Sequence, residues 1–421
     1  MEFDDFDYDY LGYRGISIHP YPGTMPFPLA QDLVLQYSKE QHTILDPFSG
    51  SGTTLRAAAC NKRYSVGIDI NPLACLIAQL TTIPFSNSDI TKYNKCREKV
   101  INLITDNELW PKDNWRERIN TWFVSRTQSR LAQITNAIHN AELSGNLKKF
   151  VLVGFSRTIR QCSLARKSEL KLWKVPETPT WEDPVTVFNS QLITLLRDII
   201  AINDESPITR QFRPKVVHGD SEKLSTRYKE IDLVLTSPPY GDAWTTVAYG
   251  NFSMLNRIWL SAIDETYGES DPTKEDAYSV GGMFRIRKNG QIGDVRAISP
   301  TLLKYFEQVY RVNEARASDL NSFCEDMFYI FKNLSRTLKE KGYVVLVVGP
   351  RKVSGVPIDV GLIFNDFMNS LGLVYHSRNN RRISGKRLPS ITSQGNIGIA
   401  ETINEETIDV FQLMGRKDEK N

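Results

Sequence analysis

Two short segments of the chain combine residue types that could bind a ligand and act on it. The first is Asp46-Pro-Phe-Ser-Gly-Ser-Gly-Thr-Thr, whose glycines allow the backbone to turn tightly and approach a ligand closely. It lacks the lysine of a P-loop, and Leu55 stands where GxGxxG would have its third glycine. Asp69 ends the next expected strand, where an acid can bind the ribose hydroxyls of an adenosine-containing cofactor. The alternative role of Asp69 is to cap a helix that has Pro72 in its first turn.

The second segment is Thr236-Ser-Pro-Pro-Tyr-Gly, directly after the apolar run 233–235. Two consecutive prolines fix the backbone and remove two amide donors, so the adjacent carbonyls have no intrinsic partners. The Ser237 hydroxyl, a free carbonyl and the Tyr240 ring then share one loop. That combination suits a planar substrate that carries an exocyclic amino group. The alternative is a rigid Pro-Pro turn that buries Tyr240 in the core.

Alternating strands and helices must position these segments. Strands are expected at 43–46, 64–68, 215–218, 232–236, 343–348, 372–376 and 407–413, and helices at 29–37, after Thr54, and at 318–339 with a C-cap at Lys341-Gly342. The run 150–153 is too short to assign as a strand. This alternation predicts an α/β fold with a doubly wound parallel or mixed sheet.

The domain organisation follows from where this alternation stops. Residues 1–18 are expected to form a flexible arm, and 19–85 with 211–421 to form the catalytic domain. Between them, apolar residues recur at helical spacing, which predicts a mostly helical insertion over 86–210. The segment 265–300 has no clear period and is expected to be a loop or small subdomain of the catalytic domain.

Composition excludes several classes of protein. Of the 421 residues, 41% are hydrophobic and 24% charged, which is typical of a protein with a real core rather than a disordered or collagenous chain. The net charge of +3 does not indicate a polyanionic partner, so any nucleic-acid surface must come from local clusters. Five scattered cysteines predict neither a metal site nor a disulfide framework. An acidic N-terminus and the lack of a long apolar run predict a soluble cytoplasmic protein with no membrane contact.

Together the two motifs resemble the amino-methyltransferases of DNA, which use S-adenosyl-L-methionine. The resemblance implies the Rossmann-like doubly wound mixed sheet of a class I methyltransferase, with a cofactor site at the first motif. His19–Pro26 resembles the family's segment preceding the glycine loop, and Asp220 falls where the family contacts the cofactor's adenine. The implied cofactor-binding residues are His19, Thr24, Asp46, Phe48, Ser49, Gly50, Gly52, Thr53, Thr54, Asp69, Ile70 and Asp220.

The second motif is the catalytic one in this family, which implies roles for Ser237, Pro238, Pro239 and Tyr240. The version that begins with serine is associated mainly with cytosine-N4 enzymes, whereas Asp or Asn is usual for adenine-N6. The resemblance therefore implies methylation of a flipped-out cytosine at a specific DNA sequence, in restriction-modification or host DNA marking. The Ser237 hydroxyl and the Pro238 carbonyl would accept hydrogen bonds from the amino group, and Tyr240 would stack on the base.

Other activities stay open. The nearest is adenine-N6 methylation of DNA. Modification of tRNA or rRNA bases is another, although related tRNA enzymes usually begin the loop with Asp and often carry an N-terminal RNA-binding domain, for which the residues before His19 are too few. A degenerate fold that only binds DNA would be expected to have damaged motifs, and both are intact. Cytosine-C5 chemistry would need a cysteine after a proline, a pair that the chain lacks.

Clusters of basic residues are the candidates for contact with double-stranded DNA. We expect the protein at the nucleoid, with a cognate restriction endonuclease that acts separately as a further partner. The alternative for each cluster is a solvated surface. The densest lies in the insertion, which we therefore expect to be the DNA-recognition region. The candidates are Lys148, Lys149, Arg157, Arg160, Arg166, Lys167, Lys171 and Lys174 in the insertion, Arg378, Arg381, Arg382, Lys386 and Arg387 near the C-terminus, and Arg285, Arg287 and Lys288 between them.

Overall fold

The computed structural model describes residues 10, 15–166, 172–175, 182–226, 228–241, 248–272, 274–282, 294–383, 391–393, 399–401 and 405–414. Most of the expected N-terminal arm lies outside these residues. Within it, the hydroxyl of Tyr10 donates a hydrogen bond to Asp32, and Ile18 is buried. The basic candidates Lys167, Lys171, Arg285, Arg287, Lys288, Lys386 and Arg387 also lie outside the described residues.

A seven-stranded sheet forms the centre of the fold. Its order is β3 (Lys215–His218), β2 (Tyr64–Asp69), β1 (Thr43–Asp46), β4 (Ile231–Thr236), β5 (Leu338–Val348), β11 (Glu405–Leu413) and β8 (Leu373–Arg382). The first five strands are mutually parallel, and β11 runs antiparallel to both of its neighbours. This mixed, doubly wound sheet has the α/β arrangement that the sequence predicted.

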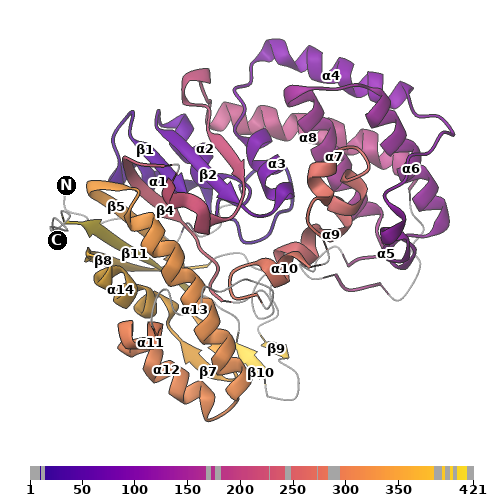
Figure 1. The fold of residues 1–421 in the computed structure, drawn as a ribbon. Helices are drawn as coiled ribbons and strands as arrows, with labels where there is room; N and C mark the ends of the chain where they lie inside the picture. Colours follow the sequence, from indigo (N-terminus) through magenta and orange to yellow (C-terminus); the bar gives the residue numbers. More distant parts are fainter. Residues whose placement is uncertain are drawn as a thin grey trace.

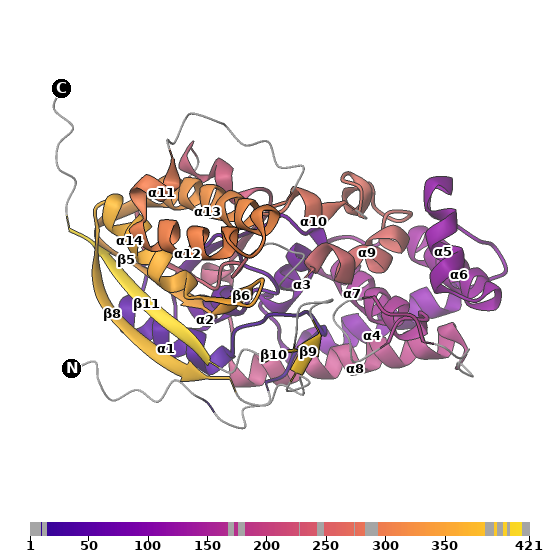
Figure 2. The same ribbon diagram turned by 90° about the horizontal axis from the view of Figure 1, so that it is seen from below.

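Helices cover both faces of the sheet, because successive strand residues point to opposite sides. Leu233 and Leu235 of β4 pack in one cluster with α1 (Phe27–Tyr37). Val234 packs in another cluster with α13 (Glu314–Ser335) and α14 (Val360–Ser370). In Figure 2, α1 and the α12–α14 group accordingly lie on opposite sides of the strands. The helices around the sheet are α1 (Phe27–Tyr37), α2 (Thr53–Cys60), α3 (Pro72–Thr81), α12 (Pro300–Tyr310), α13 (Glu314–Ser335) and α14 (Val360–Ser370).

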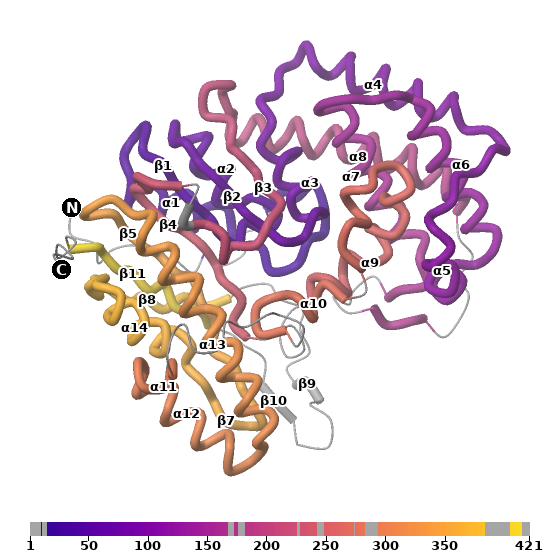
Figure 3. Tube along the Cα trace, viewed as in Figure 1, coloured from indigo at the N-terminus to yellow at the C-terminus, as the bar shows by residue number. Residues whose placement is uncertain are grey.

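The helical region predicted between β2 and β3 consists of α4 (Asn87–Asn102), α5 (Arg116–Trp122), α6 (Ser125–Asn140), α7 (Gly145–Cys162) and α8 (Pro184–Glu205). The chain leaves the sheet after β2, passes through these helices and returns at β3 (Figure 3). Figure 1 shows them grouped to one side of the sheet. Their hydrophobic core is continuous with α3 and α9 (Tyr249–Leu260), so the described part of this region shares its core with the rest of the protein.

The run 150–153, which was too short to assign as a strand, lies inside α7, a helix whose apolar residues are buried along most of its length. One sequence expectation needs correction. The helix expected at 318–339 ends at Ser335, and β5 already begins at Leu338. Lys341 has a φ of 62° within β5, where the pairing with β4 shifts register. Lys341-Gly342 is therefore an irregularity within a strand rather than a helix C-cap.

α8 is long and apolar enough to cross a membrane by length and composition. Its Phe188, Leu192 and Leu195 are buried in the same core as α7, so one face of α8 packs inside the protein.

The remaining described elements are short. They are η1 (Asp113–Trp115), η2 (Arg210–Phe212), η3 (Ser221–Thr226), η4 (Glu265–Gly268), α10 (Glu275–Tyr278), α11 (Val295–Ile298), the paired strands β6 (Arg351–Val353) and β7 (Val356–Ile358), and the paired strands β9 (Ile391–Ser393) and β10 (Ile399–Glu401).

Candidate active site

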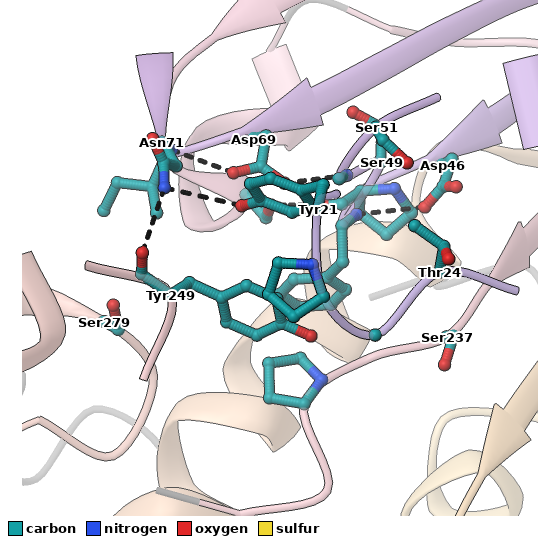
Figure 4. Close-up of a pocket in the computed structure, with 18 of the residues that line it drawn as sticks. Tyr21, Thr24, Asp46, Ser49, Ser51, Asp69, Asn71, Ser237, Tyr249 and Ser279 are labelled. Atoms are coloured by element: carbon teal, nitrogen blue, oxygen red, sulfur yellow. Dashed lines mark hydrogen bonds between the residues drawn. The ribbon is translucent and has the colours of Figure 1, made fainter. Parts of the chain in front are cut away.

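A pocket opens at the carboxyl ends of β1, β2 and β4, the edge where open α/β sheets bind their ligands. Predicted residues from both motifs line it: Thr24, Asp46, Phe48, Ser49, Gly50, Thr53, Thr54, Asp69, Ile70, Asp220, Ser237 and Pro239. Figure 4 shows Asp69 and Asn71 on one side of this pocket, and Thr24, Asp46 and Ser237 on the other. The fold therefore brings the glycine loop and the Ser-Pro-Pro-Tyr loop to one cavity.

The two predicted glycines have different structural reasons. Gly50 has a φ of 48° and donates its backbone N–H to Asp69 Oδ2 at 2.8 Å. A Cβ on Gly50 would meet only the Tyr21 ring at 3.8 Å, so the loop is open on its pocket side. Gly52 has a φ of 91°, does not line the pocket, and a Cβ there would lie 2.9 Å from the Ala78 Cβ. Gly52 thus permits the close packing of α2 on α3.

Asp69 accepts hydrogen bonds from two backbone amides and is not the N-cap of α3. Its Oδ1 accepts a hydrogen bond from the Asn71 N–H at 2.8 Å, and its Oδ2 accepts the one from Gly50. The cap of α3 is Asn71, whose side chain accepts from the Leu73 N–H, so the alternative role of Asp69 does not hold. Burial raises the pKa of Asp69 to about 6, and the two backbone hydrogen bonds oppose that rise. A carboxylate can accept further hydrogen bonds, so Asp69 retains capacity for ligand hydroxyls.

Asp46 joins the two motifs. Its Oδ1 accepts a hydrogen bond from the Thr236 hydroxyl at 2.7 Å and one from the Phe48 N–H at 3.1 Å. Burial raises the pKa of Asp46 to about 6, although hydrogen bonds from Thr236, Thr54 and Phe48 lower it. The residue immediately before Ser237 is therefore anchored to the carboxylate that begins the glycine loop.

An aromatic pair that was not among the predicted site residues lies in the pocket. The rings of Tyr21 and Tyr249 stack with centroids 5.8 Å apart. The Asn71 amide lies within hydrogen-bond distance of the Tyr21 hydroxyl at 3.4 Å and of Ser253 Oγ at 3.0 Å. Tyr21 belongs to the turn-rich segment already singled out, so its position was detectable. Nothing in the sequence around Tyr249 indicates that this helix terminus reaches the cofactor motif.

The segment expected to be a loop or small subdomain also contributes to the pocket wall. Glu275, Ser279 and Val280 line the cavity. Glu275 forms an ion pair with Arg257 of α9, and both side chains are buried. The carboxylate of Asp276 accepts hydrogen bonds from two amides at the start of α9, each at 2.8 Å. The remaining pocket residues that were not predicted are Pro22, Gly23, Met25, Pro47, Ser51 and Ser221.

His19 was expected to bind the cofactor, but the structure places it against α7 and not in the pocket lining. Its Nε2 lies 2.9 Å from Ser156 Oγ, and the side chain is buried. Burial lowers the pKa of His19 to about 3, with Arg157 and Arg160 contributing. His19 is therefore a neutral packing residue that fixes the N-terminal segment to the helical region.

The Ser-Pro-Pro-Tyr loop has one half in the pocket and one half beside it. Ser237 and Pro239 line the cavity, whereas Pro238 is buried and Tyr240 packs against the α13 side of the sheet. Ser237 Oγ lies 3.1 Å from the Tyr240 hydroxyl, which donates a hydrogen bond to Glu406 Oε1 at 2.8 Å. Burial and the nearby Glu406 carboxylate raise the pKa of Tyr240 well above its usual value, so the phenol stays protonated.

Several basic residues expected at the DNA surface have internal partners instead. Arg157 Nη1 lies 2.8 Å from Asp198, and Lys148 Nζ lies 2.7 Å from Asp264. Arg160 is buried, with its guanidinium over the Phe252 ring. Arg381 is buried and paired with Glu406. Arg378 is paired with Asp359 and Asp409. Lys149 is half-buried, and burial and the nearby charge of Arg213 lower its pKa.

Exposed basic residues do remain beside a short antiparallel pair of segments. Ala165 pairs with Lys174, and the Arg166 N–H donates to the Trp173 carbonyl at 2.8 Å. Arg166 and Lys174 are exposed, and Trp173 is 57% exposed. The Leu172 N–H donates to Asn251 Oδ1 at 2.8 Å, which anchors this pair of segments to α9. Arg382 is also exposed.

Within the residues that the structure describes, no group of three His, Cys, Asp or Glu side chains could hold a metal ion. The five cysteines are free thiols.

Comparison with known proteins identifies relatives of this chain. The family model described as DNA methylase matches residues 8–80. Type II methyltransferase M.MvaI of Kocuria varians is 31% identical over 420 residues, which cover 92% of this chain and 89% of that protein. Type II methyltransferase M.BsoBI of Geobacillus stearothermophilus is 22% identical over 86% of this chain and 80% of its own length. The orphan methyltransferase M.BamHII of Bacillus amyloliquefaciens is 43% identical over 14% of this chain and 22% of its own. The chain therefore belongs to the DNA amino-methyltransferase family, whose cofactor is S-adenosyl-L-methionine.

Proposed function

We propose that the protein methylates the exocyclic N4 amino group of a cytosine that is flipped out of a specific sequence in double-stranded DNA. The observation that carries this proposal is that Ser237 and Pro239 line the same pocket as Asp69 and Gly50. A serine at the first position of the catalytic loop supports cytosine-N4 over adenine-N6. The role of each site residue is part of the proposal.

The lining of the pocket fits S-adenosyl-L-methionine. Asp69 keeps acceptor capacity for ribose hydroxyls after its two backbone hydrogen bonds. Ile70 and Asp220 also line the pocket, and the adenine would lie beside them. The polar side chains of Thr24 and Asp46 lie across the pocket beside Ser237 and suit the amino-acid portion (Figure 4). When bound, the cofactor supplies a sulfonium methyl group, which is a good electrophile.

The catalytic loop supplies acceptors rather than a covalent nucleophile. The N4 lone pair of cytosine is delocalised into the ring, so the amine is a weak nucleophile. Hydrogen bonds from the amino group to the Ser237 hydroxyl and the Pro238 carbonyl would strengthen as positive charge develops on nitrogen, which stabilises the transition state. From its position beside the cavity, Tyr240 would stack on the base. Holding both reactants in line would supply much of the remaining acceleration.

We assign contact with DNA to basic and aromatic residues that are exposed. Extruding a base costs a few kcal/mol, which stacking and phosphate contacts must offset. Arg166 and Lys174 flank the exposed Trp173, and the pair of segments that carries them is anchored to α9, whose first residue is Tyr249 of the pocket. This combination of charge and aromatic surface beside the active site supports a DNA-contacting role.

The biological setting is proposed by analogy with the relatives, two of which are named type II methyltransferases. We propose that the protein acts in the cytoplasm at the nucleoid, in host DNA marking or beside a separately acting endonuclease.

The test is to incubate the protein with S-adenosylmethionine carrying a labelled methyl group and, separately, with genomic duplex DNA and bulk tRNA. Each nucleic acid is digested, and the labelled nucleoside is identified by mass spectrometry. N4-methylcytosine in DNA is the expected product. N6-methyladenine would assign the nearest alternative, and label in tRNA alone would refute DNA methylation. The matched control is Asp69→Ala, which should lower labelling through loss of cofactor binding.

A further inference from the structure

Three side chains form a hydrogen-bonded line that leaves the pocket, and an ion pair continues this line to the far strands of the sheet. Ser237 Oγ lies 3.1 Å from the Tyr240 hydroxyl, which lies 2.8 Å from Glu406 Oε1. Glu406 Oε2 in turn lies 2.9 Å from Arg381 Nε. Glu406 and Arg381 are directly opposed across β11 and β8, so two strands at one edge of the sheet hold a loop that follows β4.

The direction of these hydrogen bonds can be deduced from the number of protons available. A phenol has one hydroxyl hydrogen, and that of Tyr240 is donated to Glu406. The Tyr240 oxygen can therefore only accept from Ser237, so the serine hydrogen points toward Tyr240. No residue that the structure describes donates to Ser237 Oγ, so both of its lone pairs are open to a ligand in the pocket that Ser237 lines.

We infer that Glu406 is a positioning residue for the reaction, which acts through Tyr240 to make Ser237 an obligatory hydrogen-bond acceptor toward the target amino group. This inference rests on the proposed function. An ionised aspartate at the first position of the loop would be an acceptor without any help, because it has no hydrogen to donate. A serine can donate or accept, so an enzyme with serine there needs a device that orients the hydroxyl hydrogen. The line to Glu406 is such a device.

The surroundings of Glu406 suit this role. Its side chain is 11% exposed and that of Arg381 is 4% exposed, so the pair is shielded from water. Arg381 occupies Oε2, which leaves Oε1 for Tyr240. The loop itself is fixed on its other side, because a Cβ on Gly241 would overlap the guanidinium of Arg351. The position of Arg381 also explains why this basic residue is absent from the surface.

The test compares Glu406→Gln and Tyr240→Phe with the neighbouring Glu405→Gln, a control whose side chain is exposed on the same strand. Glutamine can turn its NH₂ group toward Tyr240 and so reverse the direction of the hydrogen bonds, whereas phenylalanine removes them. A hydrogen bond to a charged group has a strength that corresponds to about a ten- to hundredfold change in rate. We therefore expect kcat for DNA methylation to fall by about that factor in both variants, with KM for DNA and the calorimetric affinity for S-adenosylmethionine within about twofold of wild type. Glu405→Gln should behave as wild type.

Combining the two substitutions separates positioning from general destabilisation. Because both act on one line, the double variant should be no slower than Tyr240→Phe alone. Wild-type kcat in Glu406→Gln, or losses that multiply in the double variant, would overturn the inference. Tyr240→Phe, which leaves the buried ion pair intact, gives the same decision if Glu406→Gln fails to fold. A wild-type protein that methylates no DNA would contradict the proposed function itself. An active wild type with an equally active Glu406→Gln variant would contradict only the inference about Glu406.

Discussion

The hydroxyl of Thr236 donates a hydrogen bond to the carboxylate of Asp46 at 2.7 Å, across 190 residues of sequence. Both side chains are buried. Through this contact the first residue of the cofactor motif and the residue before the catalytic serine are held as one unit. Asp46 also accepts a hydrogen bond from the Phe48 amide in its own loop. A change at Thr236 should therefore alter both the free energy of unfolding and the affinity for the cofactor.

Thr236→Val removes that hydroxyl with little change in volume. Because a buried carboxylate loses a hydrogen bond, we expect the free energy of unfolding to fall by about 1–3 kcal/mol and the affinity for S-adenosylmethionine to weaken. The control is Thr135→Val in α6, a buried threonine whose hydroxyl bonds only to a carbonyl one turn earlier. Denaturant unfolding of both variants, with calorimetry of cofactor binding, makes the comparison. Equal losses in the two variants would remove any special role for the Thr236 hydroxyl.

Cofactor affinity should rise with pH through about 6, because burial raises the pKa of Asp46 and of Asp69 to about 6. Ribose hydroxyls and an ammonium group bind the ionised carboxylates. The affinity should therefore reach its maximum above about pH 7 and fall below about pH 6. Binding should release protons near pH 6, about half a proton for each carboxylate that is half-protonated beforehand. Calorimetry in buffers of different ionisation enthalpy measures this release, and Asp69→Asn should reduce it. An affinity that is constant from about pH 5 to 8 would contradict the assignment.

For the same two groups, ionisation opposes folding of the unliganded protein. Their contribution to the free energy of unfolding is fully present below the usual aspartate pKa of 3.8 and is lost as pH rises through about 6. Saturating S-adenosylmethionine should remove this loss, because the ligand stabilises the ionised forms.

The two glycines of the cofactor loop should give separable effects. Gly50→Ala should weaken cofactor binding, because its positive φ disfavours a side chain and the new Cβ faces the pocket. Gly52→Ala should chiefly lower stability, because its Cβ would meet Ala78. The Ala78→Gly single variant measures the cost of a glycine within α3, about 0.5–1 kcal/mol. The double variant should lose less stability than the sum of the two single variants, because the Ala78 Cβ is one of the atoms that the new side chain meets. Losses that simply add would show that the positive φ of Gly52, rather than its packing on Ala78, sets the cost.

DNA affinity should depend on the exposed segment around Trp173 and not on the paired arginine of α7. Trp173→Ala should weaken DNA binding by about tenfold, since base stacking contributes about 1–3 kcal/mol. Arg166→Ala with Lys174→Ala should also flatten the dependence of log affinity on log salt by about 0.9 for each phosphate that these side chains neutralise. Arg157→Ala is the matched control, since its partner is Asp198, and it should lower stability while leaving the salt slope intact. Wild-type affinity and slope in the exposed-site variants would move the DNA interface elsewhere.

The sequence was sufficient for the features that depend on neighbouring residues. The buried strands are short apolar runs, and each motif follows directly from a strand, so the sheet edge and its loops were predictable. The run 150–153 was ambiguous because α7 is buried on most sides, and its apolar residues therefore lack a clear helical stripe.

Features that depend on distant partners were not predictable. The basic residues Arg157 and Arg381 looked like surface charges because Asp198 and Glu406 come from other elements. Tyr249 reaches the pocket only because α9 packs on α3 and α7. In the same way, the hydrogen bond between Tyr240 and Glu406 joins residues 166 positions apart and has no local signature.

The most direct test of the account is the amount of N4-methylcytosine formed in duplex DNA by the wild-type protein and by Ser237→Ala, measured by mass spectrometry of digested DNA. We expect the wild type to accumulate N4-methylcytosine. Ser237→Ala should form at least about tenfold less, because the amino group loses an acceptor in the transition state, while its calorimetric affinity for S-adenosylmethionine stays near that of wild type. Methylation of adenine by the wild type, or wild-type levels of N4-methylcytosine from Ser237→Ala, would contradict the account.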